Sequence, residues 1–597
     1  MTLEANNPDQ HLNNSHERTG QSTGVPLWYH FTPPHGWMND PCAPGYDTET
    51  KLYHIFYQWN PKGIEWGNMS WGHSVSKDLV HWDRVGGDRP ALEPTSEYDR
   101  EGVFTGCFQP SGMHQEKNQL TAFYTSVNKL PLKFNIPYHY GQESLSYATS
   151  TDQGKTWTKG FENPILKGPP ESIKEMTGWR DPYIQKWAAF DKACGVSTES
   201  LYGIISGGSK GIEPNSYIYE IDANDLSRWN YLGPLVTSLG LNFRPSKKWS
   251  GDFGVNWEVT NFMTLEDGTT SQEFLILGAE GGAQRDHLVN MVLPEGLQER
   301  TARWGLWMSG DLVKTGDNVQ LQYKYGGILD HGVYYAANSF HDPVHNRRVV
   351  WGWVPEEDIP VRHLETRGFN GCMGILRELF LVTIPNVVGT LRTPLDQLPT
   401  IQLIPNEHGT NTLHTLGIRP LREYDLVRGR PIYNVDNLAL PAADFALYET
   451  SVRSKRWVME SIIEVKAGCK SVGVVFRQNK EKSVFSSILF DPLEEEIAVN
   501  RAYSNNDDAI SKCQEKGPHT LFQMDNNGVK SQEKLKLSIF CDDFVVEVFA
   551  NDRFALSTTV YVDDADALGI SLMAAGELGS AVFESTTIWQ MEQLNLV

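Results

Sequence analysis

Three acidic residues stand out because each lies in a short segment that also contains a tryptophan. They are Asp40, Asp181 and Glu258, in the segments WMNDP, WRDP and NWEV. Enzymes that split glycosidic bonds use paired carboxylates, and the faces of sugars pack on aromatic rings. Three such acids far apart in the sequence therefore predict a carbohydrate-cleaving site, if the fold brings them together.

Each acid also has an ordinary structural interpretation. Asp40 precedes a proline, and Asp-Pro favours an Asx turn by itself. Asp181 can form a structural ion pair with Arg180; in a site, Arg180 is expected to favour the ionised form of Asp181, which would stabilise a positively charged transition state. The apolar neighbours of Glu258 favour its protonated form, as a general acid requires, but a solvent-facing glutamate on an edge strand fits them equally.

Other candidates are less specific. Glu280 lies in the glycine-rich segment LGAEGG, where a turn is the ordinary interpretation. Four aromatic residues are either sugar platforms or core residues, with core favoured for all except the first: Trp66, Trp71, Phe104 and Trp351. The sequence has no glycine-rich phosphate loop, Ser-His-Asp order or metal-ligand spacing, so no metal site or cofactor is expected.

A repeated turn suggests how the acids are positioned. Segments that begin with aspartate and end with tryptophan start at Asp78, Asp152 and Asp225, and a weaker copy without tryptophan contains Asp311. These aspartates are separated by 74, 73 and 86 residues, with short β-type runs between them and few helical patterns. An all-β repeat of this length predicts propeller blades, and five blades of about 75 residues would fill roughly the first 375.

The candidate residues share roughly one position within this repeat. Asp40, Thr105, Asp181 and Glu258 precede the four turn aspartates by 38, 47, 44 and 53 residues. The first strand of each propeller blade lines the central axis. We therefore expect these residues to converge in one axial pocket.

The chain divides into four predicted parts. Residues 1–24 are polar and expected to be disordered, and 25–380 form the five-bladed β-propeller. Residues 381–430 contain several prolines and are predicted to be a linker with few strands. Alternating apolar runs then predict a β-sandwich over 431–597, with a structural or interface role. The fold class is thus all-β, a five-bladed propeller followed by a sandwich.

Composition narrows the expected partners and compartment. The 597 residues carry a net charge of −22, which disfavours nucleic acid and anionic membranes as partners. The seven cysteines are scattered and odd in number, which favours free thiols. A signal peptide and an 18-residue apolar run are both lacking, so a cytoplasmic protein is expected. The oligomeric state is left open, and a homodimer is compatible with the sequence.

Taken together, these motifs resemble glycoside hydrolase family 32, which contains invertases, inulinases and fructosyltransferases. The resemblance rests on ordered segments spread over about 220 residues, and it extends to the C-terminal part of the chain. The matching segments are WMNDP (37–41), FYQWNP (56–61), WG (66–67), WGH (71–73), GVFTG (102–106), RDP (180–182) and WE (257–258). The resemblance implies a five-bladed propeller followed by a β-sandwich, in line with the repeat.

The resemblance also implies roles for the acids. Asp40 matches the nucleophile that forms a covalent fructosyl-enzyme, Glu258 the acid and base, and Asp181 the transition-state stabiliser. Because the family is retaining, the carboxyls of Asp40 and Glu258 are expected to lie about 5–5.5 Å apart. Residues at positions that surround the fructosyl unit in the family are expected to bind substrate. They are Asn39, Gln58, Trp66, Thr105 and Arg180, together with Phe104, which lies in the same segment as Thr105.

Two departures point to one branch of the family. Cys42 follows Pro41 where many family hydrolases have asparagine, and Val259 follows Glu258 where many have cysteine. Both resemble the fungal fructosyltransferase and transfructosylating branch, and Glu280 and His287 match residues on its acceptor side.

The sequence therefore predicts a retaining β-fructofuranosidase that cleaves sucrose and transfers fructose to a second sucrose, giving short fructooligosaccharides. A fructan exo-hydrolase acting on inulin or levan is the nearest alternative. A catalytically inactive sugar-binding propeller and an inverting propeller glycosidase on arabinans are more distant ones.

Overall fold

The computed structural model describes residues 27–594 except 174, 198, 290, 298 and 317, so the segment predicted to be disordered lies outside the described residues. Strands dominate the described part. Its helices are short: α1 (Ala188–Cys194), α2 (Val361–Arg367), η1 (Glu97–Asp99), η2 (Leu395–Gln397), η3 (Glu407–Gly409) and η4 (Arg422–Val427). Among the described residues, every helix falls short of the length and apolarity needed to cross a membrane.

Four consecutive antiparallel sheets of similar design occupy the N-terminal half. In each sheet the strands pair in chain order. The sheets are β1 (Gly36–Asp47), β2 (Leu52–Asn60), β3 (Ser70–Ser76) and β4 (Trp82–Arg84); β5 (Gly102–Gln109), β6 (Leu120–Val127), β7 (Glu143–Ser150) and β8 (Thr158–Lys159); β9 (Met176–Lys186), β10 (Leu201–Ser209), β11 (Glu213–Ile221) and β12 (Trp229–Pro234); and β13 (Asn256–Glu266), β14 (Ser271–Glu280), β15 (Arg303–Thr315) and β16 (Asn318–Ile328).

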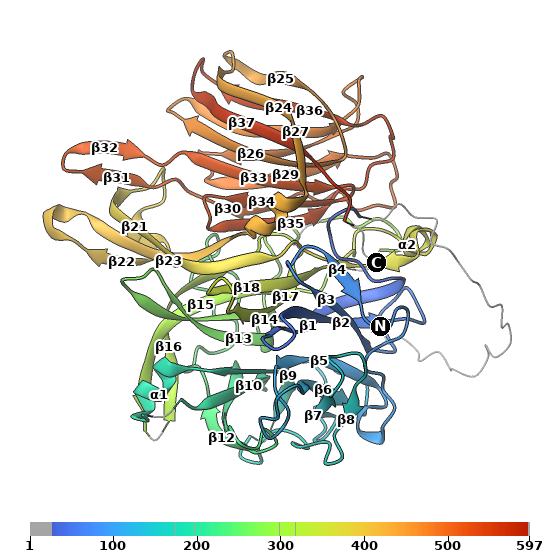
Figure 1. Ribbon diagram of the computed structural model, residues 1–597. Coiled ribbons are helices and arrows are strands. Elements are labelled where there is room, and N and C mark those ends of the chain that lie inside the picture. The colour runs from blue at the N-terminus through green and yellow to red at the C-terminus, as the bar shows by residue number, and fades with distance from the viewer. Residues whose placement is uncertain are drawn as a thin grey trace.

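A further sheet begins with β17 (Tyr335–Asp342) and β18 (Arg347–Val354), and the sheets together form a ring. The first strands contact one another in the cyclic order β1, β5, β9, β13, β17 and back to β1. The ring is closed by β19 (Phe369–Asn370), which pairs in parallel with β1 although it follows β18 in the chain. This arrangement is a β-propeller, drawn from blue through green to yellow in Figure 1.

The repeated aspartate turns are present in three of the four expected places. Trp82, Trp157 and Trp229 each donate the indole N–H to the backbone carbonyl three residues earlier, between the third and fourth strands of a sheet. The prediction at Asp311 was wrong. Asp311 lies within β15, next to a β-bulge, and its exposed carboxylate pairs with Lys324 at 2.5 Å. A Ser-Gly-Asp segment thus fits a bulge as well as a turn.

The expectation of few strands in residues 381–430 was also wrong. β21 (Arg377–Gly389), β22 (Gln402–Pro405) and β23 (Asn411–Pro420) continue the sheet of β17 and β18, and β20 (Cys372–Met373) pairs with β18. The prolines occupy positions that spare the hydrogen-bond ladder. Pro385 lies at a register shift of β21, and Pro405 ends the edge strand β22.

The C-terminal part consists of two six-stranded sheets packed face to face, the predicted sandwich. One sheet has the order β24-β37-β26-β33-β34-β35 and the other β25-β36-β27-β28-β29-β30. Their strands are β24 (Arg428–Ala439), β25 (Ala443–Arg453), β26 (Arg456–Val465), β27 (Cys469–Gln478), β28 (Phe485–Asp491), β29 (Glu496–Tyr503), β30 (Glu515–Pro518), β33 (Leu535–Asp542), β34 (Val545–Ala550), β35 (Phe554–Thr559), β36 (Gly569–Gly576) and β37 (Ala581–Met591).

The sandwich lies against the propeller and shares hydrogen bonds with it. Figure 1 shows it stacked on the propeller, with β34 and β35 nearest. His331 and Val333 of the propeller donate backbone N–H groups to Ala555 and Ser557 of β35. The hairpin of β31 (Gln523–Asn526) and β32 (Val529–Gln532) leaves the sandwich to pair with β21. The two domains are therefore joined along several elements.

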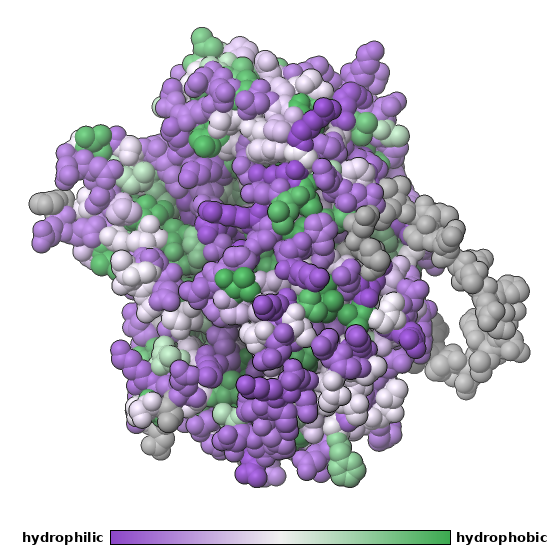
Figure 2. All heavy atoms as spheres, in the orientation of Figure 1, coloured by the Kyte–Doolittle hydropathy of each residue, from purple (hydrophilic) through white to green (hydrophobic). Residues whose placement is uncertain are grey.

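Polar residues cover most of the visible surface. Figure 2 shows a face on which polar residues predominate and apolar residues are scattered among them. All seven cysteines are unpaired, as the sequence predicted.

Candidate active site

The four residues expected to share a position lie on the first strands of four successive sheets. Asp40 is on β1, Thr105 on β5, Asp181 on β9 and Glu258 on β13. At or next to each of them, the pairing with the second strand shifts register. A β-bulge bends its strand and re-aims side chains, so the repeated bulge turns these residues towards one another. The expectation from the repeat holds here, although one reference turn was misplaced.

The backbone at two of these bulges adopts the left-handed region. Asp181 has φ 63° and Val259 φ 46°. This region is unfavourable for a β-branched residue such as valine. In this conformation the backbone N–H of Val259 donates to Asp181 Oδ2 at 3.1 Å. Local strain at Val259 thus contributes to the placement of Asp181.

Asp40 is half-buried and well supplied with donors. Its Oδ2 accepts from the Thr105 hydroxyl at 2.6 Å and its Oδ1 from the Asn39 amide at 3.1 Å. Gln58 Nε2 donates to Thr105 Oγ1 at 2.6 Å, which leaves the single hydroxyl proton of Thr105 for Asp40. Burial raises the pKa of Asp40 to about 6, with a further increase from Glu258, while the two donors act in the opposite direction.

Arg180 forms ion pairs with three glutamates of the site. It donates through Nε and Nη2 to Glu258 Oε1 at 3.0 and 2.8 Å, through Nη1 to Glu143 at 2.8 Å, and through Nη2 to Glu280 at 3.1 Å. Asn256 also donates to Glu280, at 2.9 Å. Burial raises the pKa of Glu280 to about 7, helped by nearby Glu258 and opposed by Arg180. One buried guanidinium therefore compensates three carboxylates.

Arg180 favours the ionised form of Asp181, as expected, but other groups outweigh its effect. Burial raises the pKa of Asp181 well above its usual range, and negative Glu258 and Asp40 add to this, so that the opposing effect of Arg180 is outweighed. The guanidinium points instead to the three glutamates. A buried aspartate next to an arginine in the sequence need not be its partner, because the bulge at this point of β9 redirects the side chains.

Glu258 is held from two sides rather than facing solvent. Arg180 binds Oε1, and Tyr335 donates its hydroxyl to Oε2 at 2.8 Å. The tyrosine ring lies 5.2 Å from the guanidinium of Arg303, which donates to Glu357 at 2.7 Å. Sequence reasoning missed these three supporting residues.

A signal for Tyr335 was present. It follows Glu258 by 77 residues, the interval that also separates Asp181 from Glu258. It lies on β17, the first strand of the remaining propeller sheet, and β17 also has a register shift next to it. Extending the repeat by one more step would have found Tyr335. Glu143 had no such signal, because it is on β7, a third strand.

The remaining candidates separate into two groups. Trp66 is 47% exposed and meets buried Phe104 edge-to-face at 6.0 Å, whereas Trp71 and Trp351 are buried in the core. This division agrees with the sequence analysis. His287 lies elsewhere: its Nε2 is 3.3 Å from Glu515 of the sandwich, and no contact among the described residues joins it directly to the three acids.

The arrangement suits acid–base cleavage with a nucleophile. Asp40 is a carboxylate oriented by two donors, and Glu258 is a second carboxyl with a hydroxyl partner that can either donate or accept. Within the described residues, no group of three or more His, Cys, Asp and Glu side chains is arranged to hold a metal ion.

Comparisons with known proteins agree with this geometry. The model of the glycosyl hydrolases family 32 N-terminal domain matches residues 30–390, and that of the family's C terminal matches 430–590. A β-fructofuranosidase, insoluble isoenzyme 2, of Oryza sativa subsp. indica is 29% identical over 63% of this chain, and the match spans only 56% of that relative's length.

Two solved structures share the whole architecture. The structure of Aspergillus kawachii β-fructofuranosidase complexed with glycerol is 25% identical, with a TM-score of 0.83 over 96% of both chains. A fructosyltransferase from A. japonicus is 24% identical with the same TM-score and coverage, a likeness that shows the fold alone. Both the ring of sheets and the sandwich therefore have counterparts in solved structures.

Proposed function

This chain belongs to glycosyl hydrolases family 32, and we propose that it is a retaining β-fructofuranosidase that cleaves sucrose and passes part of the fructose to a second sucrose. One observation carries the proposal. The first strands of successive sheets bring Asp40, Asp181 and Glu258 together, with Glu258 held between Arg180 and Tyr335. The cyclic order of the five first strands supports five propeller blades.

In the first proposed step, Asp40 attacks the anomeric carbon of the fructosyl unit. Glu258 gives a proton to the glycosidic oxygen, and glucose leaves. The positive charge that develops on the ring favours the ionised form of Asp181, which in turn stabilises that charge. Thr105 and Asn39 occupy lone pairs of Asp40 and so orient the carboxylate for attack.

In the second step Glu258 acts as a base and takes a proton from water or from a sugar hydroxyl. Once Asp40 is esterified its negative charge is gone, so that it no longer repels the carboxylate of Glu258. The Tyr335 hydroxyl can accept from the protonated acid and donate to the carboxylate. This contact therefore serves both states of Glu258.

Transfer requires that a sugar hydroxyl outcompetes abundant water. A bound acceptor achieves this through a high effective molarity. Cys42 and Val259 support transfer, since both resemble the fungal transfructosylating branch. The side of the site next to Glu258, formed by Tyr335, Arg303 and Glu357, is the natural place for the acceptor, because the leaving oxygen must lie within reach of that acid.

Product analysis on sucrose tests the proposal. We expect free glucose to exceed free fructose, increasingly so at high sucrose concentration, because fructose then passes to sugar instead of water. Equal amounts at all concentrations would contradict transfer and leave a hydrolase. Absence of glucose together with rapid release of fructose from inulin would favour a fructan hydrolase instead.

The raised pKa of Asp40 predicts an acid limit to activity. Because the nucleophile must be ionised, kcat/KM should fall as pH drops below about 6. Replacing Thr105 with valine removes a hydrogen bond that lowers this pKa. The acidic limb of the pH profile, where kcat/KM falls, should therefore move to higher pH by roughly one unit. The measurement is kcat/KM from pH 4 to 8.

Thr105→Ser is the matched control, since it keeps the hydroxyl and should keep the limb near its original pH. A limb at the same pH in Thr105→Val and the wild type would show that Asp40 does not set it.

A further inference from the structure

A buried cluster of four charges joins the propeller to the sandwich beside the active site. Its cations are Arg300, in the loop before β15, and Arg501, on β29; its anions are Asp358, in the segment after β18, and Glu515, on β30. None of the four side chains is more than 8% exposed. Because unpaired buried charge is strongly unfavourable, such a cluster fixes the positions of its members.

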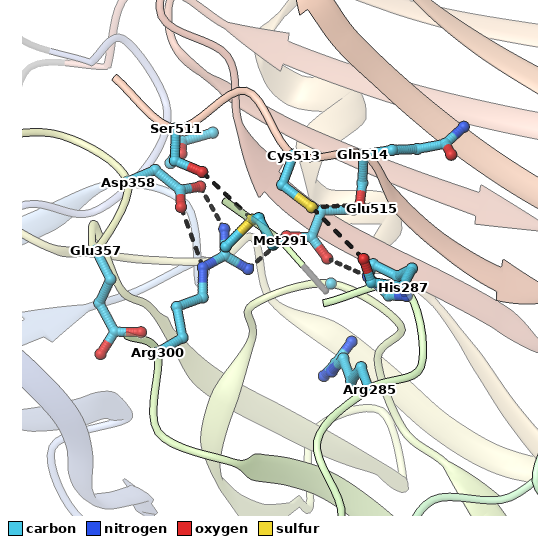
Figure 3. Close-up of polar contacts among 12 residues, drawn as sticks. Arg285, His287, Met291, Arg300, Glu357, Asp358, Ser511, Cys513, Gln514 and Glu515 are labelled. Atoms are coloured by element: carbon cyan, nitrogen blue, oxygen red, sulfur yellow. Dashed lines mark hydrogen bonds and ion pairs between the residues drawn. The ribbon is translucent and has the colours of Figure 1, made fainter. Parts of the chain in front are cut away.

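Each anion of the cluster comes from a different domain, and both share the same cations. Arg300 donates through Nε and Nη2 to the two oxygens of Asp358, and through Nη1 to Glu515 at 2.5 Å. Figure 3 shows its guanidinium between these two carboxylates. Arg501 Nη2 lies 2.6 Å from Asp358 and 3.5 Å from Glu515. The sandwich thus holds two propeller segments at once.

The same two segments form a wall of the active site. Arg303 follows Arg300 by three residues and donates to Glu357, the neighbour of Asp358. The outer pair, Arg300 and Asp358, contacts the sandwich, whereas the inner pair, Arg303 and Glu357, lies towards Tyr335. Arg303, Glu357 and Tyr335 line one hollow. A shift of Arg300 and Asp358 is therefore expected to move Arg303, which packs on Tyr335, the hydrogen-bond partner of Glu258.

The loop before β15 has a second attachment to the sandwich. His287 Nε2 lies 3.3 Å from Glu515 Oε2. Within the loop itself, Gln284 donates to the backbone carbonyl of Arg300 at 3.0 Å. Figure 3 shows His287 directed at Glu515. Glu515 of the sandwich consequently binds both His287 and Arg300 of this loop.

We propose that Glu515 is a positioning residue through which the sandwich shapes the part of the active site that binds the non-fructosyl sugar. Acting through Arg300 and Asp358, it holds Arg303 and Glu357 against Tyr335. The sugar bound there is first the leaving glucose and then the acceptor, because Glu258 protonates the oxygen between the two rings. This inference rests on the proposed function and gives the sandwich a part in catalysis.

The test compares Glu515→Gln with the wild type in the full chain. The substitution keeps the size of the side chain and removes one charge from a balanced cluster. We expect KM for sucrose to rise about threefold while kcat changes less than about twofold, since positioning rather than chemistry is affected. The excess of glucose over fructose at high sucrose should fall by a similar factor.

Glu495→Gln is the matched control. Glu495 is a fully buried sandwich carboxylate that accepts from the backbone of Arg392 and Thr393 and has no link to Tyr335 among its described contacts. It should lower the thermal midpoint without changing KM or the product ratio. A second check combines Glu515→Gln with Arg303→Met: if Glu515 acts through Arg303, the two effects on KM will not add.

Several outcomes would overturn the proposal. One is a Glu515→Gln variant that loses thermal stability as Glu495→Gln does but keeps the wild-type KM and product ratio. If Glu515→Gln does not fold, Arg300→Lys is measured by the same criteria, since lysine keeps the charge but not the two-pronged contact. If the wild type releases equal glucose and fructose, KM alone decides. A wild type that releases no glucose from sucrose overturns the proposed function and this inference together.

Discussion

Replacement of Asp40 with asparagine is expected to lower kcat on sucrose by at least about 10⁴-fold, the scale seen when a member of a catalytic set is lost. The amide nearly preserves the shape of the side chain but cannot form the covalent bond to fructose. The amide oxygen can still accept from Thr105, whereas the NH2 group cannot accept from Asn39, so one hydrogen bond is lost and the fold should be retained. Steady-state rates, measured with a sensitive glucose assay, give the size of the effect.

A rapid-quench experiment adds a more specific readout. If a fructosyl-enzyme forms, the wild type can release a first equivalent of glucose before fructose appears, whereas Asp40→Asn should show no such phase. Asp47→Asn is the matched control: Asp47 is a buried carboxylate of the same strand that binds Glu49 and Thr50 in a turn. Fructose release by Asp40→Asn at the wild-type rate would refute the assignment of the nucleophile.

The convergence of the acids was predictable from the sequence because it follows from the repeat. A propeller places corresponding residues of successive sheets around one axis, so approximate spacing suffices. The failed turn at Asp311 illustrates this tolerance, since Glu258 still lies on the first strand of its sheet. The prediction depended on the phase within the sheet and not on the turn that marked it.

The partners of these acids were far less predictable. Arg180 adjoins Asp181 in the sequence, yet its guanidinium binds Glu143, Glu258 and Glu280 from three other strands. Which carboxylate an arginine selects depends on bulges and side-chain directions that period-two reasoning does not resolve. Glu515 is a stronger case, because the segment that holds it shows no acid–tryptophan pattern and only domain packing brings it near the site.

Arg180 provides the second large prediction. Replacing it with glutamine leaves buried Glu143 and half-buried Glu258 and Glu280 without their shared cation, and removal of one partner from a buried ion pair typically costs about 3–5 kcal/mol. We expect a loss of this size in the free energy of unfolding, measured by chemical denaturation at pH 7. Sucrose cleavage should also fall steeply, since Glu258 loses the group that fixes its Oε1.

The pH dependence of this loss separates a charge effect from a simple packing effect. The pKa of Glu280 is already raised from 4.5 to about 7 with Arg180 present, and should rise further without it. When the pKa of a carboxyl is higher in the folded than in the unfolded state, the protein loses stability as the pH rises from the unfolded-state pKa to the folded-state pKa. The deficit of Arg180→Gln should therefore be larger at pH 8 than at pH 5.

Arg228→Gln is the control, because Arg228 is a largely exposed partner of Asp225 whose loss should matter little. Equal deficits for the two variants at both pH values would show that Arg180 does not compensate the three glutamates.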